Sequence, residues 1–382
     1  MKLENYRLAA TGKRLPAHVN CVRQRVGSLG VDTKPEELWR VHASAQELAA
    51  VDVSADGVSL LEVKSRIADQ MLESCALCER RCGANRLGGD TGFCGVGRES
   101  FYFFEQTLWG EEPPLIPSHE VFFSGCNLRC KFCYSWQALL DPNLGTCVSP
   151  VDFAKLIEAR HEEGAVNLNL IGGEPTVHLP AILKTLRLLN IPVPIVWNSN
   201  FFMSDEAMRL LNGVVDLYLG DFRFGCNACA ERLGGVNGYV SAAKRNFKLA
   251  HETGDLIIRH LVLPGHVDCC LAPIADWASE NLPDVPFNLM FQYTPFFEAL
   301  DDPALCRSLL PEEERRALEI VASRGLNTQN WRKPLDRTPR GDGIGKGEIS
   351  TTITIRPDGR VGIMHLHGEL LDVVRALECG GK

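Results

Sequence analysis

Three cysteines, Cys126, Cys130 and Cys133, lie in the run Gly-Cys-Asn-Leu-Arg-Cys-Lys-Phe-Cys-Tyr, directly after an apolar segment that ends at Ser124. Thiolates this close together in one loop are typical of metal ligation. A 4Fe-4S cluster usually takes four cysteine ligands, so a loop that supplies three leaves one iron open to another molecule. A structural zinc would need a fourth ligand nearby, but the next cysteine or histidine is Cys147. The spacing therefore favours an iron-sulfur cluster.

A second cysteine group precedes this loop in the pattern C-x2-C-x3-C-x11-C. It comprises Cys75, Cys78, Cys82 and Cys94. Glycines within this segment allow the tight turns that bring thiolates around a metal. Four ligands indicate a closed site, which suits a structural zinc or an auxiliary 4Fe-4S cluster equally well, with free or redox-active thiols as the remaining alternative. The chain holds 15 cysteines, and such clusters fit ligation in a reducing cytoplasm better than a disulfide framework.

The elements that position these cysteines follow a βα alternation. Apolar, β-branched runs alternate with amphipathic helical stretches, which predicts parallel strands with helical crossovers. The predicted strands are 121–124, 167–171, 195–198, 216–219, 256–262 and 288–293, and the predicted helices between them are 151–163, 179–190, 204–211, 239–253 and 271–281. Six such units are too few for a closed eight-stranded barrel.

The flanking segments give the predicted domain plan. It consists of an N-terminal helical extension at 1–74, a Cys-rich metal segment at 75–118, a partial barrel at 119–300, and a C-terminal helix, loop and β-hairpin at 301–382. Within it, we expect helices at 35–50, 57–72 and 311–325, an irregular Gly- and Pro-rich loop at 332–347, and hairpin strands at 351–355 and 361–364.

The run Gly172-Gly173-Glu174-Pro175 follows the second predicted strand. Together with the C-x3-C-x2-C loop and the aromatic Phe132, it resembles the radical S-adenosylmethionine (radical SAM) superfamily. The resemblance implies a partial (β/α)6 TIM-like barrel, a 4Fe-4S cluster whose open iron is chelated by the amino and carboxylate groups of SAM, and contact of Gly172, Gly173 and Glu174 with the SAM amino group. Taken alone, Gly-Gly-Glu-Pro would serve equally well as a turn before a helix.

Polar residues end the later strands, at the face where ligands of parallel α/β folds collect. Asn198 and Asn200 suit a ribose or a carboxylate, or cap the following helix. Asp221 is a candidate cofactor contact or a barrel salt bridge. Successive strand residues point to opposite faces, and the resemblance favours Arg259, rather than His260, as the contact near SAM.

Four further cysteines remain open in role. Cys226 and Cys229 follow the fourth strand and suit another metal, redox chemistry or plain surface thiols. Cys269 and Cys270 carry less information, because adjacent cysteines rarely chelate one metal well.

The two cysteine segments resemble those of uncharacterised paralogues of pyruvate formate-lyase activating enzyme. The resemblance extends from residue 75 to about 295. This resemblance implies reductive cleavage of SAM to a 5'-deoxyadenosyl radical and an external one-electron donor such as flavodoxin or ferredoxin. It also implies hydrogen abstraction from a small molecule or a protein, with a glycyl-radical protein as the substrate that the activating enzymes suggest. The alternative is a non-catalytic iron-sulfur or zinc protein with a structural or electron-transfer role.

Composition and charge argue against two classes of partner, nucleic acids and membranes. The formal net charge of −8 argues against broad nucleic-acid binding, which usually shows a basic footprint. The sequence has no apolar run of about 18 residues that would span a membrane, and its first residues lack the apolar core of a signal peptide. We therefore expect a cytoplasmic protein without a membrane partner.

Overall fold

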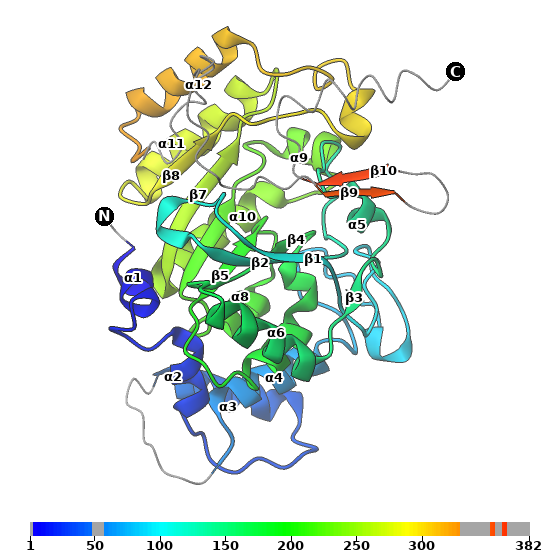
Figure 1. Ribbon diagram of the computed structural model, residues 1–382, viewed down its shortest axis with the longest axis vertical. Helices are drawn as coiled ribbons and strands as arrows, with labels where there is room; N and C mark the ends of the chain where they lie inside the picture. The colour runs from blue at the N-terminus through cyan, green and yellow to red at the C-terminus, as the bar shows by residue number, and fades with distance from the viewer. Residues whose placement is uncertain (1–2, 48–56, 329–351, 356–360, 365–382) are drawn as a thin grey trace. The chain divides into compact units, whose positions relative to one another are not determined.

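A mixed sheet of eight strands in the order β3-β1-β2-β4-β5-β6-β7-β8 forms the centre of the molecule (Figure 1). The strands are β1 (Phe101–Leu108), β2 (Ser118–Phe123), β3 (Thr146–Cys147), β4 (Leu168–Gly172), β5 (Ile195–Ser199), β6 (Leu217–Asp221), β7 (Asp255–Leu261) and β8 (Phe287–Met290). Strand β2 and strands β4 to β8 pair in parallel. These six strands lie where the sequence predicts them. The antiparallel strands β1 and β3, which extend the sheet beyond β2, were not predicted.

This computed structural model describes residues 3–47, 57–328, 352–355 and 361–364. Residues Met1–Arg332 form one compact unit and Lys333–Lys382 a second. In the second unit, β9 (Thr352–Ile355) and β10 (Val361–Met364) pair antiparallel, so the predicted hairpin is confirmed. The loop predicted at 332–347 lies outside the described residues, and the boundaries of the four predicted segments stay predictions.

Twelve α-helices are described. They are α1 (Glu4–Ala10), α2 (Ala17–Arg23), α3 (Pro35–Glu47), α4 (Leu60–Gln70), α5 (Trp136–Leu140), α6 (Pro150–Glu162), α7 (Leu179–Leu186), α8 (Asp205–Leu211), α9 (Asn227–Gly234), α10 (Tyr239–Thr253), α11 (Ala272–Asn281) and α12 (Pro311–Ser323). Helix α7 ends four residues before its predicted end. Pro192 and Pro194 follow closely, and the residue before a proline avoids helical backbone.

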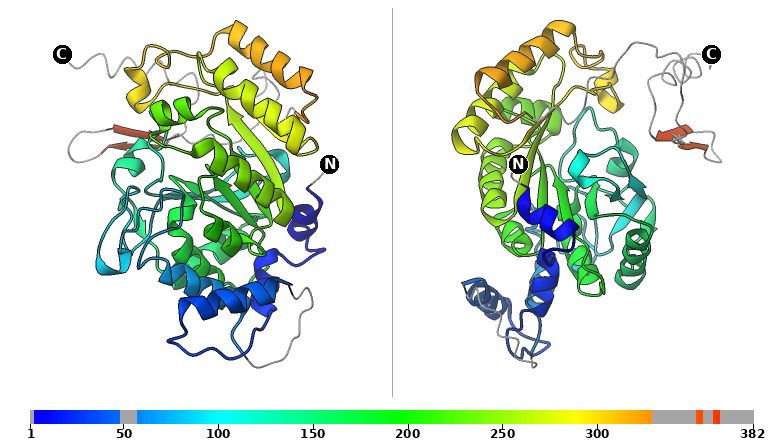
Figure 2. Two further views of the ribbon diagram at one scale, coloured as in Figure 1. Left: turned by 180° about the vertical axis from the view of Figure 1, so that it is seen from behind. Right: turned by 60° about the vertical axis from the view of Figure 1, so that its left-hand side comes forward.

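The crossover helices pack on the outer side of the sheet (Figure 2). Alternate strand residues, including Val121, Leu170, Trp197 and Ile258, are buried in one core with side chains of α6, α7, α8, α10 and α11. Because neighbouring strand residues point to opposite sides, the residues between them face the inner side. Along each strand, one alternate set of side chains therefore packs against the helices, and the other set points into the interior of the sheet.

Helix α1 packs at the amino ends of the strands. Its Tyr6, with Leu3 just before it, joins a separate inner core that includes Val196 and Leu219. The Tyr6 backbone N–H donates to a carboxylate oxygen of Asp255 at 2.8 Å. The amino end of the interior is thus occupied by apolar side chains, and the polar inner residues lie toward the carboxyl end.

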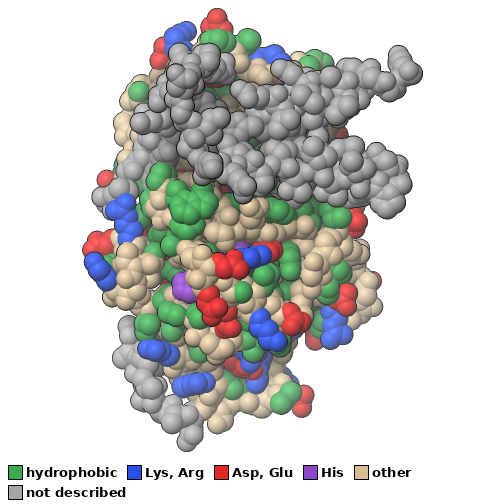
Figure 3. All heavy atoms as spheres, viewed as in Figure 1, with side chains coloured by type: hydrophobic (Ala, Val, Ile, Leu, Met, Phe, Trp, Pro, Cys, Tyr) green, Lys and Arg blue, Asp and Glu red, His purple; other side chains and the backbone are tan. Residues whose placement is uncertain are grey.

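On the uncovered part of the face in Figure 3, acidic and basic side chains lie interspersed. Within the described part of the chain, no helix combines the length and apolar character needed to cross a membrane.

Candidate active site

The predicted cluster loop follows β2 at the carboxyl end of the sheet. Cys126 and Cys130 are buried, and Cys133 is partly buried. Burial raises the pKa of the Cys133 thiol to about 12, with the charge of Cys130 adding to the effect. Burial likewise raises the pKa of Cys126, and Glu174, Cys130 and Cys133 raise it further by their charges. The three thiols therefore lie within electrostatic range of one another. A metal that bound them would displace their protons.

The glycine pair after β4 lets this loop fold closely against the sheet. A Cβ on Gly173 would lie 2.0 Å from the carbonyl oxygen of Gly125, and one on Gly172 would lie 2.2 Å from the backbone nitrogen of Phe123. The Gly173 N–H donates to the Phe123 carbonyl at 2.8 Å. The close backbone approach directly before Cys126 thus requires both glycines.

Glu174 is buried and joins the ends of β4 and β5. Its Oε1 accepts hydrogen bonds from the Thr176 N–H at 3.1 Å, the Thr176 hydroxyl at 2.5 Å and the Ser199 hydroxyl at 2.8 Å. Its Oε2 accepts from the Asn200 N–H at 3.0 Å. The carboxylate therefore positions the loop after β5, and its contact with a SAM amino group stays a prediction.

Asn200 reaches from that loop to the cysteines. Its Nδ2 donates to Oδ1 of Asn127 at 2.8 Å and lies 3.8 Å from Cys126 Sγ. The Leu128 N–H points at the same sulfur at 3.4 Å. Donors aimed at this sulfur favour its thiolate form, which is the form that binds metal.

Arg259 lies on the inner side of β7 within an acidic group. Its Nε donates to Asp221 at 2.9 Å, its Nη1 to Glu111 at 2.9 Å, and its Nη2 to Asn198 Oδ1 at 3.1 Å. Burial raises the pKa of Glu111 to about 7, although the Arg259 charge opposes the shift. His260 points the other way and contacts the Phe222 carbonyl, as the strand parity predicts.

Arg223 links this acidic group to the cluster loop. Its Nη2 donates to the second oxygen of Asp221 at 2.8 Å. Burial raises the pKa of the Cys130 thiol, and the Arg223 charge opposes that rise. Burial also acts to raise the pKa of Asp221, but the charges of Arg259 and Arg223 hold it below its usual value.

Several buried polar atoms on the inner side lack a hydrogen-bond partner within the described residues. They are both side-chain polar atoms of Asn169, Nδ2 of Asn198, Nε of Arg223 and Oε2 of Glu112. Unpaired buried polar groups are uncommon and costly. A polar ligand that paired with them would remove this cost.

Phe132 packs in an aromatic group. Its ring lies edge-on to Phe224 at 6.2 Å and to Tyr293 at 6.3 Å between centroids. The ring therefore holds the cluster loop against the segments after β6 and β8. A role in cofactor binding stays a prediction.

The second cysteine group also assembles. Burial raises the pKa of Cys78 to about 12, and the charges of Cys94, Cys75 and Cys82 act on it as well. Three of these thiols are buried and Cys82 is exposed. Arg86, itself buried, lies with Nη1 4.0 Å from Cys75 Sγ. The four thiols lie within electrostatic range of one another, but their sulfurs are not among the described ligand atoms that lie within 4.8 Å of one another.

This group lies directly against the cluster loop. A Cβ on Gly125 would lie 3.0 Å from the Cys94 carbonyl oxygen. Arg80 donates to the Asn127 carbonyl at 2.6 Å, and its guanidinium stacks 3.3 Å from the centroid of Phe93. The two cysteine segments are thus parts of one packed region.

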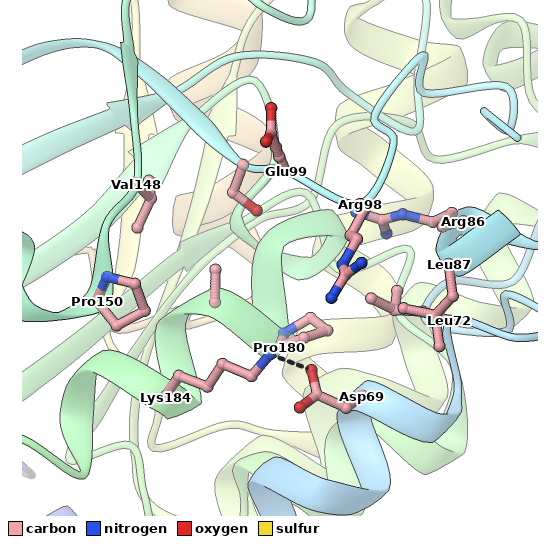
Figure 4. Close-up of a pocket in the computed structure, with 12 residues that line it drawn as sticks. Asp69, Leu72, Arg86, Leu87, Arg98, Glu99, Val148, Pro150, Pro180 and Lys184 are labelled. Atoms are coloured by element: carbon pink, nitrogen blue, oxygen red, sulfur yellow. Dashed lines mark ion pairs between the residues drawn. The ribbon is translucent and has the colours of Figure 1, made fainter. Parts of the chain in front are cut away.

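A cavity of about 360 Å³ is lined in part by Arg86 (Figure 4), which also lies near Cys75. Arg86 lines it, and Lys184 pairs with Asp69 at 2.7 Å across its floor. Its lining includes no residue of the cluster loop, so it is separate from the predicted SAM site.

A third group was missed by sequence reasoning. The ligand atoms of Cys229, His266, Cys269 and Cys270 lie within 4.8 Å of one another. Among the described residues, no other group of three or more His, Cys, Asp or Glu side chains is this compact. The halves of this third group are far apart in the chain. The available signals were the C-x2-C spacing at Cys226 and the adjacent cysteines, and neither spacing shows that the two pairs meet.

The chain is similar in sequence and in fold to several known proteins. Residues 121–278 match the family model described as "Radical SAM superfamily". Uncharacterized protein MJ0674 of Methanocaldococcus jannaschii is 41% identical over 303 residues, covering 76% of this chain and 88% of that protein. The 7-carboxy-7-deazaguanine synthase of Halobacterium salinarum is 32% identical over 97 residues, 21% of this chain and 37% of that protein.

Among solved structures, Streptococcus suis SuiB aligns with a TM-score of 0.39 and 14% identity over 55% of this chain and 46% of its own. A radical SAM methyltransferase from Sphaerobacter thermophilus aligns with a TM-score of 0.39 and 14% identity, over 56% of this chain and 66% of its own. The aligned region thus spans less than half of SuiB.

Proposed function

Because the chain belongs to the radical SAM superfamily, we propose that it is an enzyme in which Cys126, Cys130 and Cys133 hold a 4Fe-4S cluster and SAM binds its open iron. When bound and reduced, the cluster supplies the electron that cleaves SAM to methionine and a 5'-deoxyadenosyl radical, which abstracts hydrogen from the substrate. The electron comes from an external donor such as flavodoxin or ferredoxin. The hydrogen donor is a small molecule or a protein, glycyl-radical proteins included.

One observation carries this proposal. Cys126, Cys130 and Cys133 lie in one buried or partly buried loop after β2, and the unpartnered polar atoms of Asn169, Asn198 and Arg223 lie on the neighbouring parallel strands or just after them. A purely structural metal site would not need unpaired polar groups beside it, because each costs about 1–3 kcal/mol when buried. A polar cosubstrate that pairs with them removes that cost.

The charge of the interior suits SAM. Asp221, Glu111 and Glu112 form ion pairs with Arg259, Glu120 lies near them with its pKa raised by burial, and Arg223 is the second cation on Asp221. More carboxyl groups than guanidinium groups therefore line this part of the interior. SAM carries a sulfonium and an ammonium group, both positive, beside one carboxylate. We assign Asn198, Asn200, Asp221 and Arg259 to the polar part of SAM, as the sequence predicted, and Gly172 and Gly173 to the backbone that its amino group approaches.

The Cys75, Cys78, Cys82 and Cys94 group is assigned a metal of its own, zinc or a second 4Fe-4S cluster. Its contact with the cluster loop through Gly125 and Asn127 supports a role in holding that loop. An iron-sulfur cluster at this place would also carry electrons toward it.

Anaerobic reconstitution with iron and sulfide, followed by dithionite and SAM, tests the activity. We expect release of 5'-deoxyadenosine, and its loss in the triple variant Cys126→Ala, Cys130→Ala and Cys133→Ala. Cys306→Ser is the matched control, because this exposed thiol donates only to the Pro303 carbonyl, at 3.7 Å. Activity that survives in the triple variant, or a parent protein that binds no iron at this loop, would favour the non-catalytic alternative.

A further inference from the structure

The third cysteine group has the dimensions of a single-ion site. Cys229 Sγ lies 3.6 Å from Cys269 Sγ and 3.5 Å from His266 Nδ1, and His266 Nδ1 lies 3.1 Å from Cys269 Sγ. A tetrahedral zinc with bonds of about 2.3 Å to sulfur and 2.0 Å to nitrogen separates its ligand atoms by roughly 3.5–3.8 Å. In a 4Fe-4S cluster each thiolate binds a different iron, so its thiolates stand farther apart.

Backbone features bring the two halves of this group together. Cys229 lies in the first turn of α9, while Cys269 and Cys270 lie in a π-helical turn, Val267–Leu271, directly before α11. A Cβ on Gly225 would lie 2.0 Å from the Cys270 carbonyl oxygen, so only glycine permits this approach. Such π-helical turns are uncommon and often mark functional sites.

We propose that Cys229, His266, Cys269 and Cys270 bind one zinc ion. Three cysteines and one histidine are a usual structural zinc set. On binding, the three thiols release their protons to solvent, and zinc with three thiolates and a neutral imidazole has a net charge of −1. The guanidinium of Arg232 lies near the site, with one nitrogen bonded to Asp302.

The contacts of His266 define what binding requires. Arg232 Nη2 now donates to His266 Nε2 at 2.7 Å. Because a neutral imidazole has one donor and one acceptor nitrogen, the proton sits on Nδ1 and faces the sulfurs. Zinc at Nδ1 moves that proton to Nε2, so Arg232 turns away and keeps its bond to Asp302, 2.8 Å from its other nitrogen. Its side chain is 45% exposed and free to do so.

The ion would fix α9 under the cluster loop. At the other end of α9, the carbonyls of Leu233 and Gly234 accept from the backbone N–H groups of Lys131 and Arg129, both at 2.8 Å. A helix of eight residues transmits a displacement at its first turn to its last. The zinc therefore supports the loop that carries Cys130 and Cys133, a role beyond the SAM chemistry itself.

Metal analysis of the purified full-length chain tests the site. We expect the zinc content to fall by one ion per chain in the Cys229→Ser/Cys269→Ser double variant relative to the parent. Cys226→Ser is the matched control: it neighbours the site and its sulfur caps α9 by accepting from the Cys229 N–H, which a serine hydroxyl does as well. The triple variant of the cluster loop should retain this zinc, which separates the site from the proposed function.

Anomalous diffraction of the parent protein at the zinc absorption edge locates the ion without any variant. A peak between Cys229, His266 and Cys269 supports the proposal, and faster amide exchange at 126–133 in the double variant supports the role of α9. Equal zinc contents in parent and double variant, a peak that belongs to iron, or zinc that is lost in Cys226→Ser but kept in His266→Gln would each overturn the assignment.

Discussion

Replacing Arg259 by methionine removes the cation from the acidic interior while keeping the apolar stem of the side chain. Arg259 is 10% exposed and contacts carboxylates of Asp221 and Glu111, each at 2.9 Å. Breaking a buried ion pair by removing one partner costs about 3–5 kcal/mol, because it leaves an uncompensated charge.

The expected change in melting temperature follows from the size of the unit. With an unfolding entropy of about 2.1 cal/mol/K per residue, the compact unit Met1–Arg332 has a total of roughly 0.7 kcal/mol/K. A loss of about 3–5 kcal/mol therefore lowers the melting temperature by about 4–7 °C.

The effect depends on pH through Glu111. Its folded pKa of about 7 lies above the ordinary value of 4.5, so its contribution to stability is fully present below pH 4.5 and is lost as pH rises through 7. In Arg259→Met the pKa of Glu111 rises further, because the nearest cation is gone. The variant is therefore closest to the parent near pH 5.5, where the carboxyl is protonated, and farthest from it near pH 8.

Thermal unfolding of parent and variant at pH 5.5 and pH 8, measured anaerobically by circular dichroism, checks this expectation. Arg315→Met is the matched control, since its pair with Glu319 is exposed and worth less than about 0.5 kcal/mol. A loss below about 1 kcal/mol at pH 8, or the same loss at both pH values, would refute the assignment of Arg259 as the cation that holds these carboxylates.

Three further substitutions test the parts of the site. Gly173→Ala places a Cβ 2.0 Å from the Gly125 carbonyl oxygen, so we expect the free energy of unfolding to fall by about 1–3 kcal/mol and less iron to be bound after reconstitution. The control is Gly97→Ala, whose Cβ would meet only a threonine methyl at 3.8 Å and which should retain its iron. Glu174→Gln replaces one carboxylate oxygen by an amide nitrogen, which cannot accept the hydrogen bond that the Asn200 N–H donates; equilibrium dialysis should show SAM binding at least about tenfold weaker, and unchanged affinity would contradict its role in placing the loop after β5. Tyr239→Phe removes the hydroxyl that contacts the carbonyl oxygens of Asn200 and Asp221. Chemical denaturation should show that the free energy of unfolding falls by about 1–3 kcal/mol; an unchanged denaturation midpoint would be the contrary result.

The parallel part of the sheet was predictable because its signal is local. Each strand is an apolar run whose alternate residues face the helices, and Arg259 and His260 separate to opposite sides as that parity requires. The antiparallel strand β1 was not predicted. Its sequence begins with four aromatic residues, Phe101–Phe104, but it precedes the alternation of strands and helices from which the parallel strands were predicted.

The cysteine loop was predictable as a group because its members are close in sequence. The hydrogen bonds of Glu174 were not predictable, since the four groups that donate to it come from the segment after it and from the end of β5. Glu111 and the pairing of Cys229 with Cys269 were missed for the same reason. Contacts between segments that are distant in the chain depend on the packing of the whole sheet, and short spacing patterns do not encode them.

The 3.6 Å between the sulfurs of Cys229 and Cys269 also bears on how the protein is handled in air. A disulfide bond is about 2.05 Å long, so in metal-free material a shift of roughly 1.5 Å joins these two atoms. Oxygen then has a second target besides the iron, and adding iron and sulfide does not reverse the damage there. Full recovery of such a preparation requires a thiol reductant before the metals are returned.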